Sequence, residues 1–214
     1  DKFGCEDPRI SKINDTYYIT YTAIDKSLEN SFGANVRIAI ASTKDFKKIT
    51  KHGIIGPSRE SKAAAIFEEP VKDGKIGFIF TDQSDSTNSH ISIRYFDSID
   101  DLLNTDYKEW NDFLKDNQDS PLGTHWWLNR GPELGAPPIK TEKGWLMIYS
   151  AESMSDTWTI TAALIDLENP NRLVARIPGS ILQPVTDYEI NGLVPNVTFP
   201  SAAQVIDDDL YVYY

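Results

Sequence analysis

The feature that most constrains this fold is a unit that recurs along the chain, a short polar turn followed by an aromatic-rich strand. The unit occurs at residues 15–23, 73–82, 142–151 and 207–214. Two of these units are followed by a second β-rich segment, at residues 37–42 and 158–166. Hairpins that recur roughly every 60 to 70 residues are typical of β-propeller blades, although a β-sandwich gives similar strands. The sequence therefore predicts an all-β fold and leaves propeller and sandwich open.

Runs of β-branched and aromatic residues between turn signals predict where the strands lie. Strands are expected at residues 16–22, 36–41, 75–81, 91–96, 145–150, 158–164 and 209–214. Residues 98–103 predict one short helical turn. Residues 105–125 are polar and aromatic without a clear period, and we interpret them as a long loop.

Charge and histidine content narrow the function classes. The chain carries 32 acidic against 21 basic side chains, a formal net charge of −11. This acidic balance argues against nucleic acid and anionic membranes as partners. No segment approaches the ~18 apolar residues that a membrane-spanning helix needs. The three histidines do not have the spacing of metal ligands, so neither a metal nor another cofactor is expected.

The length of 214 residues suits one domain of ordinary size that spans residues 1–214. The chain opens at Asp1 without an initiator methionine and stops at Tyr214 inside a predicted strand. Both ends are therefore expected to be cuts in a longer protein, and the compartment stays open between bacterial periplasm and cytoplasm. Cys5, the single cysteine of the sequence, is expected to be a small buried residue.

Residues 4–10, GCEDPRI, place two carboxylates beside an arginine just before a predicted strand. In a propeller, such a segment leads into the innermost strand, whose start faces the central channel. The carboxylates of Glu6 and Asp7 could then perform acid–base catalysis, while Arg9 fixes a hydroxyl or tunes a pKa. The same residues would also fit a turn with a surface salt bridge.

A second polar and aromatic cluster lies at residues 123–130, GTHWWLNR. Tryptophan faces stack on the C–H surfaces of sugars, and His, Asn and Arg side chains supply directional hydrogen bonds. His125, Trp126 and Arg130 are therefore candidates for substrate binding. Of the two neighbouring tryptophans, one is expected in the core and one in the cleft.

Several ordered segments resemble glycoside hydrolase family 130, the β-mannoside phosphorylases and β-mannosidases. They are GCEDPRI (4–10) with YYITYTA and RIAIAST, AAAIFEEPVKDGK (63–75), GAPPIKTEKGWLMIYS (135–150), AALIDLENPNRLVAR (162–176) and YEINGLVPNVTFPSA (188–202). The resemblance implies a five-bladed β-propeller, of which this chain would cover roughly three to four blades.

The resemblance also implies roles for individual residues. Asp7 matches the aspartate of the family's EDPR motif, which acts as general acid and protonates the glycosidic oxygen through a sugar hydroxyl. Glu6 and Arg9, in the same motif, would line the sugar site. Tyr188 and Asn196 match a later motif of the family, where they would shape the sugar pocket or brace the loop.

Three departures from the family pattern concern phosphate. Where phosphorylase members carry an arginine at a strand end, this chain reads Thr81-Asp82-Gln83. Ser150 stands in place of a histidine, and approximately Gly131 stands in place of a lysine. Phosphate carries close to two negative charges near neutral pH, so it would be repelled by Asp82 without these bases. The departures therefore favour water as the acceptor.

The sequence thus predicts an inverting hydrolase that cleaves β-mannosidic linkages of short mannosides, with an oligosaccharide as its partner. An inverting hydrolase needs a carboxylate base that activates water, and Glu152 is the first candidate and Glu133 the second. The first alternative is a mannoside phosphorylase that recruits phosphate with Arg59, Lys62 or Arg130. The second alternative is a carbohydrate-binding propeller without catalysis. Assembly as a homo-oligomer stays open.

Overall fold

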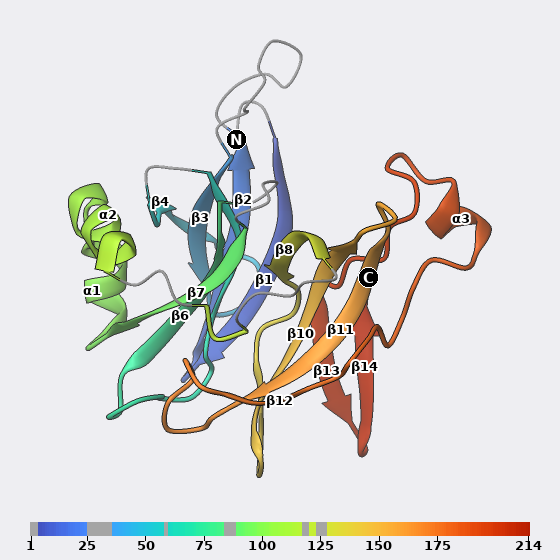
Figure 1. Cartoon of the computed structure of the whole chain (residues 1–214). Coiled ribbons are helices and arrows are strands. Elements are labelled where there is room, and N and C mark those ends of the chain that lie inside the picture. Colours follow the sequence, from blue (N-terminus) through green and yellow to red (C-terminus); the bar gives the residue numbers. More distant parts are fainter. Residues whose placement is uncertain (1–3, 25–35, 58–59, 84–88, 117–119, 123–127) are drawn as a thin grey trace.

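The computed structural model describes residues 4–24, 36–57, 60–83, 89–116, 120–122 and 128–214 of the chain. Strands dominate this part of the chain, and they form four separate antiparallel sheets (Figure 1). The all-β prediction is therefore confirmed. Within each sheet, strands that follow one another in sequence mostly pair with one another, because short turns connect them.

The first sheet has the strand order β1-β2-β3-β4. Its strands are β1 (Cys5–Ile13), β2 (Thr16–Ile24), β3 (Val36–Thr43) and β4 (Thr50–Ile55). A tight turn joins the first two strands, and Asn14 takes a left-handed conformation there, with φ of 53°. Asparagine tolerates this conformation better than most residues, so the Asn14-Asp15 turn signal of the sequence is used as expected.

The other three sheets follow in sequence. The second sheet, in the order β5-β6-β7, contains β5 (Ser61–Ile66), β6 (Ile76–Asp82) and β7 (His90–Phe96). The third, in the order β12-β11-β10-β8 with β9 beside β10, contains β8 (Leu128–Leu134), β9 (Ile139–Thr141), β10 (Gly144–Ser153), β11 (Trp158–Ile165) and β12 (Leu173–Arg176). The fourth is the hairpin of β13 (Ala202–Ile206) and β14 (Asp209–Tyr213).

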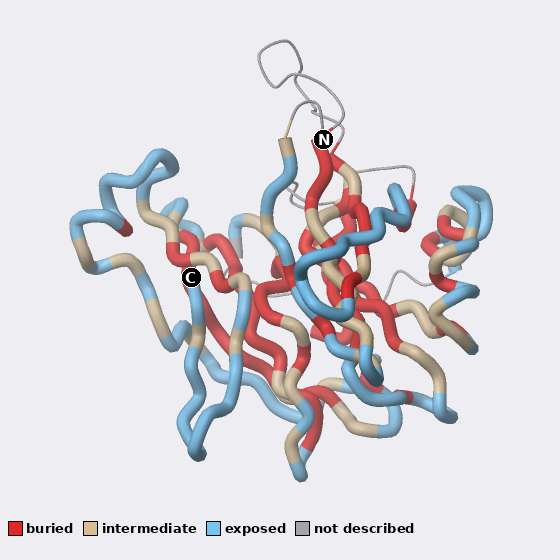
Figure 2. The backbone as a smooth tube through the Cα atoms, turned by 180° about the vertical axis from the view of Figure 1, so that it is seen from behind, coloured by how far each residue is buried: buried red, intermediate tan, exposed pale blue. Residues whose placement is uncertain are grey.

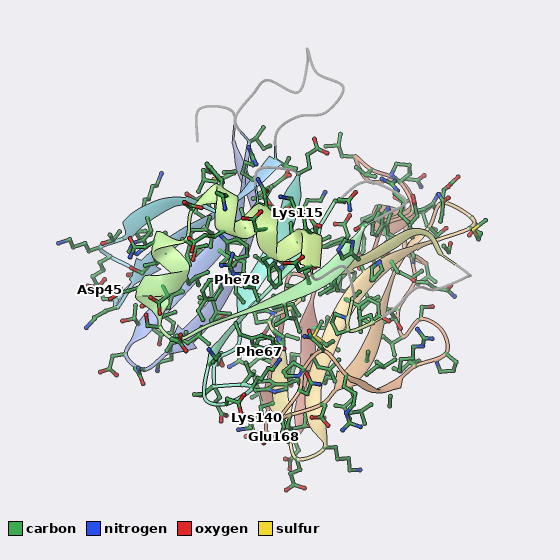
Figure 3. The ribbon with its side chains drawn as sticks, turned by 60° about the vertical axis from the view of Figure 1, so that its left-hand side comes forward. Asp45, Phe67, Phe78, Lys115, Lys140 and Glu168 are labelled. Atoms are coloured by element: carbon green, nitrogen blue, oxygen red, sulfur yellow. The ribbon has the colours of Figure 1, made fainter. Side chains whose placement is uncertain are left out.

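Three apolar layers hold neighbouring sheets together in the described part of the chain, and the smallest joins the third sheet to Ala203 and Val212 of the fourth. Ile79, Ile91 and Ile93 of the second sheet pack with Trp145 and Met147 of the third. On the other face of the second sheet, a second layer joins it to the first sheet through Ile38, Ile40, Ile66, Phe78 and Phe80. Both faces of the second sheet are thus buried, as the red trace in Figure 2 shows for the middle of the molecule. Figure 3 shows Phe67 and Phe78 inside and Asp45 and Glu168 at the periphery.

Two helices follow β7 and cover the edge of the second apolar layer (Figure 1). The first, α1 (Ile99–Asn104), begins where the sequence predicts a helical turn, because the Ser98 hydroxyl accepts a hydrogen bond from the Asp101 amide. The second, α2 (Tyr107–Asp116), lies in the segment interpreted as a loop, so that interpretation is wrong. Trp110 and Leu114 form the buried stripe of α2, and this stripe is too short to stand out in the sequence.

A short helix, α3 (Asp187–Ile190), lies in the connection between the third and fourth sheets. Cys5 is exposed, which contradicts the expectation of a buried residue, because it lies at the first position of an outward-facing part of β1. Across the described ranges, the helices are too short and too polar to cross a membrane.

Candidate active site

Asp7 lies in a β-bulge inside β1 rather than ahead of the strand. The register of β1 against β2 shifts between Glu6 and Arg9, and Asp7 has a φ of 54°. Pro8 has no amide hydrogen, so the ladder could not continue regularly through this point. A bulge turns one side chain away from the strand's normal alternation, and the carboxyl group it redirects here is that of Asp7. Asp7 is half-buried, and Glu6 is exposed.

Arg9 is buried, with 1% of its surface exposed, and its guanidinium binds backbone carbonyls. Nη1 donates to the Asp7 carbonyl at 2.8 Å, Nε donates to Gly135 at 2.5 Å, and Nη2 donates to Leu134 at 2.9 Å. Burial lowers the pKa of Arg9 to about 10, while the negative charges of Asp7 and Glu133 oppose this shift. The guanidinium therefore stays protonated at neutral pH and joins β1 to the end of β8.

Glu133, near the end of β8, is buried with 2% of its surface exposed. Its Oε2 lies 3.9 Å from the Nζ of Lys62, which reaches over from β5. Its charge also acts on Arg9, so the structure brings Glu133 and Asp7 to the same guanidinium. Residues from β1, β5 and β8 thus lie close together.

Glu152 and Arg130 form a bidentate ion pair between β10 and β8. The Arg130 Nε donates to Oε2 at 2.5 Å, and its Nη2 donates to Oε1 at 2.9 Å. The guanidinium also lies 5.4 Å from the ring centre of Trp158, within the range of a cation–π contact. Asn129 donates a further hydrogen bond to Oε2 of Glu152 at 3.2 Å. Both glutamates named as candidate bases therefore lie beside a cation.

Asp82 and Ser150 stand where the family resemblance implies phosphate ligands, and both side chains have other partners in this structure. Asp82 is fully buried, and its carboxylate lies 3.5 Å from Nε2 of His90 and accepts a hydrogen bond from Ser61 at 3.3 Å. The hydroxyl of Ser150 donates to the carbonyls of Thr159 and Thr198. The sequence analysis did not predict the contact of Asp82 with His90. The register of β6 against β7 could have revealed it, because these two residues lie directly opposite each other.

Tyr188 and Asn196 lie in the connection that contains α3, and the Asn196 carbonyl accepts a hydrogen bond from the amide of Trp158, whose ring contacts Arg130. Tyr188 is 72% exposed, and Asn196 takes a left-handed conformation with φ of 59°. Their neighbour Glu189 braces the loop: the amides of Thr186 and Val185 and the Tyr214 hydroxyl lower its pKa to about 2. Of the two roles left open for this motif, bracing the loop is the one that the contacts of Glu189 support.

The remaining candidates lie outside the described residues, namely His125, Trp126 and Arg59. Among the described residues, no three His, Cys, Asp or Glu side chains group closely enough to hold a metal ion. A cavity of about 610 Å³ lies near the site but does not include it. Pro8, directly after Asp7, lines this cavity together with residues 68–69, 137–140 and 201–205.

Comparison with known proteins places the chain in a family. A family model described as beta-1,4-mannooligosaccharide phosphorylase matches residues 1–214. A 1,2-beta-oligomannan phosphorylase of Thermoanaerobacter sp. is 32% identical over 99% of this chain. A beta-1,2-mannobiose phosphorylase of the same organism is 34% identical over 100% of this chain. The chain spans 64% of the length of each of these two relatives.

Solved structures agree with this placement. The beta-1,2-mannobiose phosphorylase from Listeria innocua, in complex with beta-1,2-mannobiose, is 30% identical and superimposes with a TM-score of 0.71. That match covers 99% of this chain and 55% of the Listeria chain. A structure reported for family 130 glycoside hydrolases that target beta-1,2 mannosidic linkages in Candida mannan shares the fold, with a TM-score of 0.69 at 21% identity. The chain belongs to glycoside hydrolase family 130.

Proposed function

We propose that the chain carries the catalytic acid of an enzyme that cleaves β-1,2-mannosidic bonds with inorganic phosphate. The observation that supports this proposal is the 32% and 34% identity, over nearly the whole chain, to two phosphorylases of β-1,2-linked mannosides. These relatives favour phosphorolysis over the hydrolysis expected from the sequence. The phosphorylase alternative therefore becomes the first candidate, and hydrolysis becomes the second.

In this proposal, Asp7 donates its proton through a sugar hydroxyl to the glycosidic oxygen. The bond between that oxygen and C1 breaks, and its electron pair leaves with the departing sugar. A phosphate oxygen forms the new bond to C1 from the opposite face, so a β-mannoside yields α-mannose 1-phosphate. The proton of the attacking hydrogen phosphate returns to Asp7 through solvent. Glu6, exposed beside Asp7, is proposed to contact the sugar.

Lys62 and Arg130 are the proposed phosphate ligands. Lys62 lies 3.9 Å from Glu133, and Arg130 pairs with Glu152. Arginine binds phosphate through the same two-pronged geometry that it uses toward a carboxylate, so phosphate can replace Glu152 as its partner. Each glutamate would then serve to hold its cation in place until phosphate arrives. This assignment makes the two ion pairs part of the acceptor site.

Three positions favour hydrolysis as the second candidate. A Cβ on Gly131 would lie 1.7 Å from the carbonyl oxygen of Ser89, so this backbone has no room for the lysine of phosphorylase members. Ser150 binds backbone carbonyls, and Asp82 adds negative charge where those members carry an arginine. In a hydrolytic reaction, Glu152 or else Glu133 would activate water.

The four sheets are proposed to be consecutive blades of a five-bladed propeller, of which roughly three to four are present. Each sheet is antiparallel, and neighbouring sheets pack against one another through the apolar layers. The cavity of about 610 Å³ supports the proposal, because residues of all four sheets or of the loops that follow their strands line it. A propeller predicts such a shared central space, whereas a two-sheet sandwich does not.

The experiment is turnover of β-1,2-mannobiose by the full-length protein, with and without inorganic phosphate. Phosphorolysis predicts that turnover requires phosphate and yields α-mannose 1-phosphate, which NMR identifies by its anomeric signal. Free mannose released at the same rate without phosphate would overturn phosphorolysis in favour of hydrolysis. The Asp7→Asn variant tests the acid, and we expect its rate to fall by about 10²- to 10⁴-fold. An unchanged rate would favour a different acid, and binding without turnover by the wild-type protein would favour the carbohydrate-binding alternative.

A further inference from the structure

We infer that Arg9 is a positioning residue that holds the Asp7 bulge in its catalytic shape, and that it does not bind the sugar. The inference rests on the proposed role of Asp7 as the acid. It differs from what the family resemblance implies, which places Arg9 among the residues that line the sugar site. The difference follows from where the guanidinium lies and what it binds.

The backbone of Asp7 has a conformation that needs support. Its φ of 54° is left-handed, which residues other than glycine rarely adopt. The ladder between β1 and β2 is interrupted between Glu6 and Arg9, so strand pairing does not supply the restraint at this point. Such a conformation persists only where the surrounding structure holds it. The bulge therefore needs a partner outside the ladder.

That partner is the side chain of Arg9. The Nη1 of Arg9 donates to the carbonyl oxygen of Asp7 itself at 2.8 Å. The other two nitrogens of the same planar group donate to Leu134 and Gly135, at the end of β8. Because the guanidinium is rigid, these three bonds fix the Asp7 carbonyl relative to a neighbouring sheet. The acid is thereby held against the strand that carries Glu133.

The burial of Arg9 keeps its side chain away from substrate. Arg9 is 1% exposed, whereas Glu6 and Pro8, two neighbours in the same segment, are exposed. A guanidinium with so little exposed surface and three backbone partners has no open face for a sugar hydroxyl. Arg9 therefore acts on the reaction through Asp7.

The test compares two substrates that differ in their need for an acid. β-1,2-Mannobiose has a poor leaving group and requires protonation, whereas 2,4-dinitrophenyl β-mannoside has a leaving group that departs without it. For Arg9→Lys, we expect kcat on mannobiose to fall about 100-fold with KM changed less than about threefold, because a misplaced catalytic group costs this much. On the dinitrophenyl substrate, kcat should fall less than about fivefold. Arg172→Lys, on an exposed arginine, is the matched control and should change neither.

Each other outcome counts against the inference. A raised KM with unchanged kcat would make Arg9 a sugar ligand. An equal loss on both substrates, or a variant that circular dichroism shows to be unfolded, would assign Arg9 to the fold alone. Asp7→Asn, assayed beside it, separates this inference from the proposed function. If Asp7→Asn keeps its rate on mannobiose, the proposed acid is wrong whatever Arg9 does.

Discussion

Replacing Gly131 by alanine should disturb the candidate site through the backbone alone. Gly131 lies in β8 between Arg130 and Glu133, and its added Cβ would stand 1.7 Å from the carbonyl oxygen of Ser89. Real Cβ contacts are essentially never closer than 3.0 Å, so the two backbones must separate by at least about 1.3 Å. The obstacle is main chain, which cannot turn aside as a flexible side chain would.

The expected size of the effect follows from that displacement. Overpacking of this kind costs about 1–3 kcal/mol of unfolding free energy. For a protein of this length, that corresponds to a decrease in Tm of roughly 2–12 °C. A shift of about 1 Å in a catalytic group costs about 100-fold in rate, so kcat/KM should fall by about that factor.

The assay is thermal unfolding by calorimetry together with kcat/KM on β-1,2-mannobiose, both on the full-length protein. Gly179→Ala is the matched control, because a Cβ there meets nothing within 4 Å and should leave both quantities unchanged. A Gly131→Ala variant with wild-type Tm and kcat/KM would refute the reasoning. It would show that β8 can move away from Ser89 without disturbing the site.

Three further predictions concern single side chains. Trp110→Ala should lower the unfolding free energy, measured by urea denaturation, by about 3–5 kcal/mol, because its side chain is fully buried beside Phe78. Tyr107→Ala, on the exposed face of the same helix, is the control and should cost far less. Glu189 has a pKa of about 2 in the folded protein against an ordinary 4.5. Its contribution to the stability of the fold is therefore fully present above pH 4.5 and is lost as the pH falls toward 2. The Tm of Glu189→Gln should therefore depend less on pH across that window than the Tm of the wild type, and an equal dependence would contradict this. Lys62→Met should raise the KM for phosphate at least about tenfold with little change in the KM for the mannoside. An unchanged KM for phosphate would show that Lys62 is not a phosphate ligand.

The strands that the sequence predicted and those that it did not predict differ in what makes them form. Segments such as 16–22 and 145–150 are rich in aromatic and β-branched residues, so local preference alone indicates a strand. β1 and β8 each contain a proline and charged residues, and β8 also contains Gly131, so their local preference for a strand is weak. They become strands because β2 and β10 offer them hydrogen-bonding edges. The residues that interrupt the pattern in β1 and β8 are those of the candidate site.

The candidate site was predictable as a set of residues but not as a set of contacts. The motif at residues 4–10 identified Asp7, and the departures from the family pattern identified Glu133 and Glu152. Nothing in the linear order indicated that Glu133 would lie beside Lys62, because β6, β7, α1 and α2 lie between β5 and β8 in the chain. Arg130 and Glu152 meet across two strands of one sheet, and their ion pair depends on a register that a bulge shifts.

The sequence alone determined the all-β class, the hairpin repeat and the resemblance that points to Asp7, because each depends on residues close together in the chain. The tertiary structure alone decided what Arg9 and Glu133 contact. Arg9 binds carbonyls more than 120 residues away, and the helix at Tyr107–Asp116 forms where its short apolar stripe finds an aromatic surface. Such contacts join segments that local preference treats as independent, so only the packed sheets can specify them.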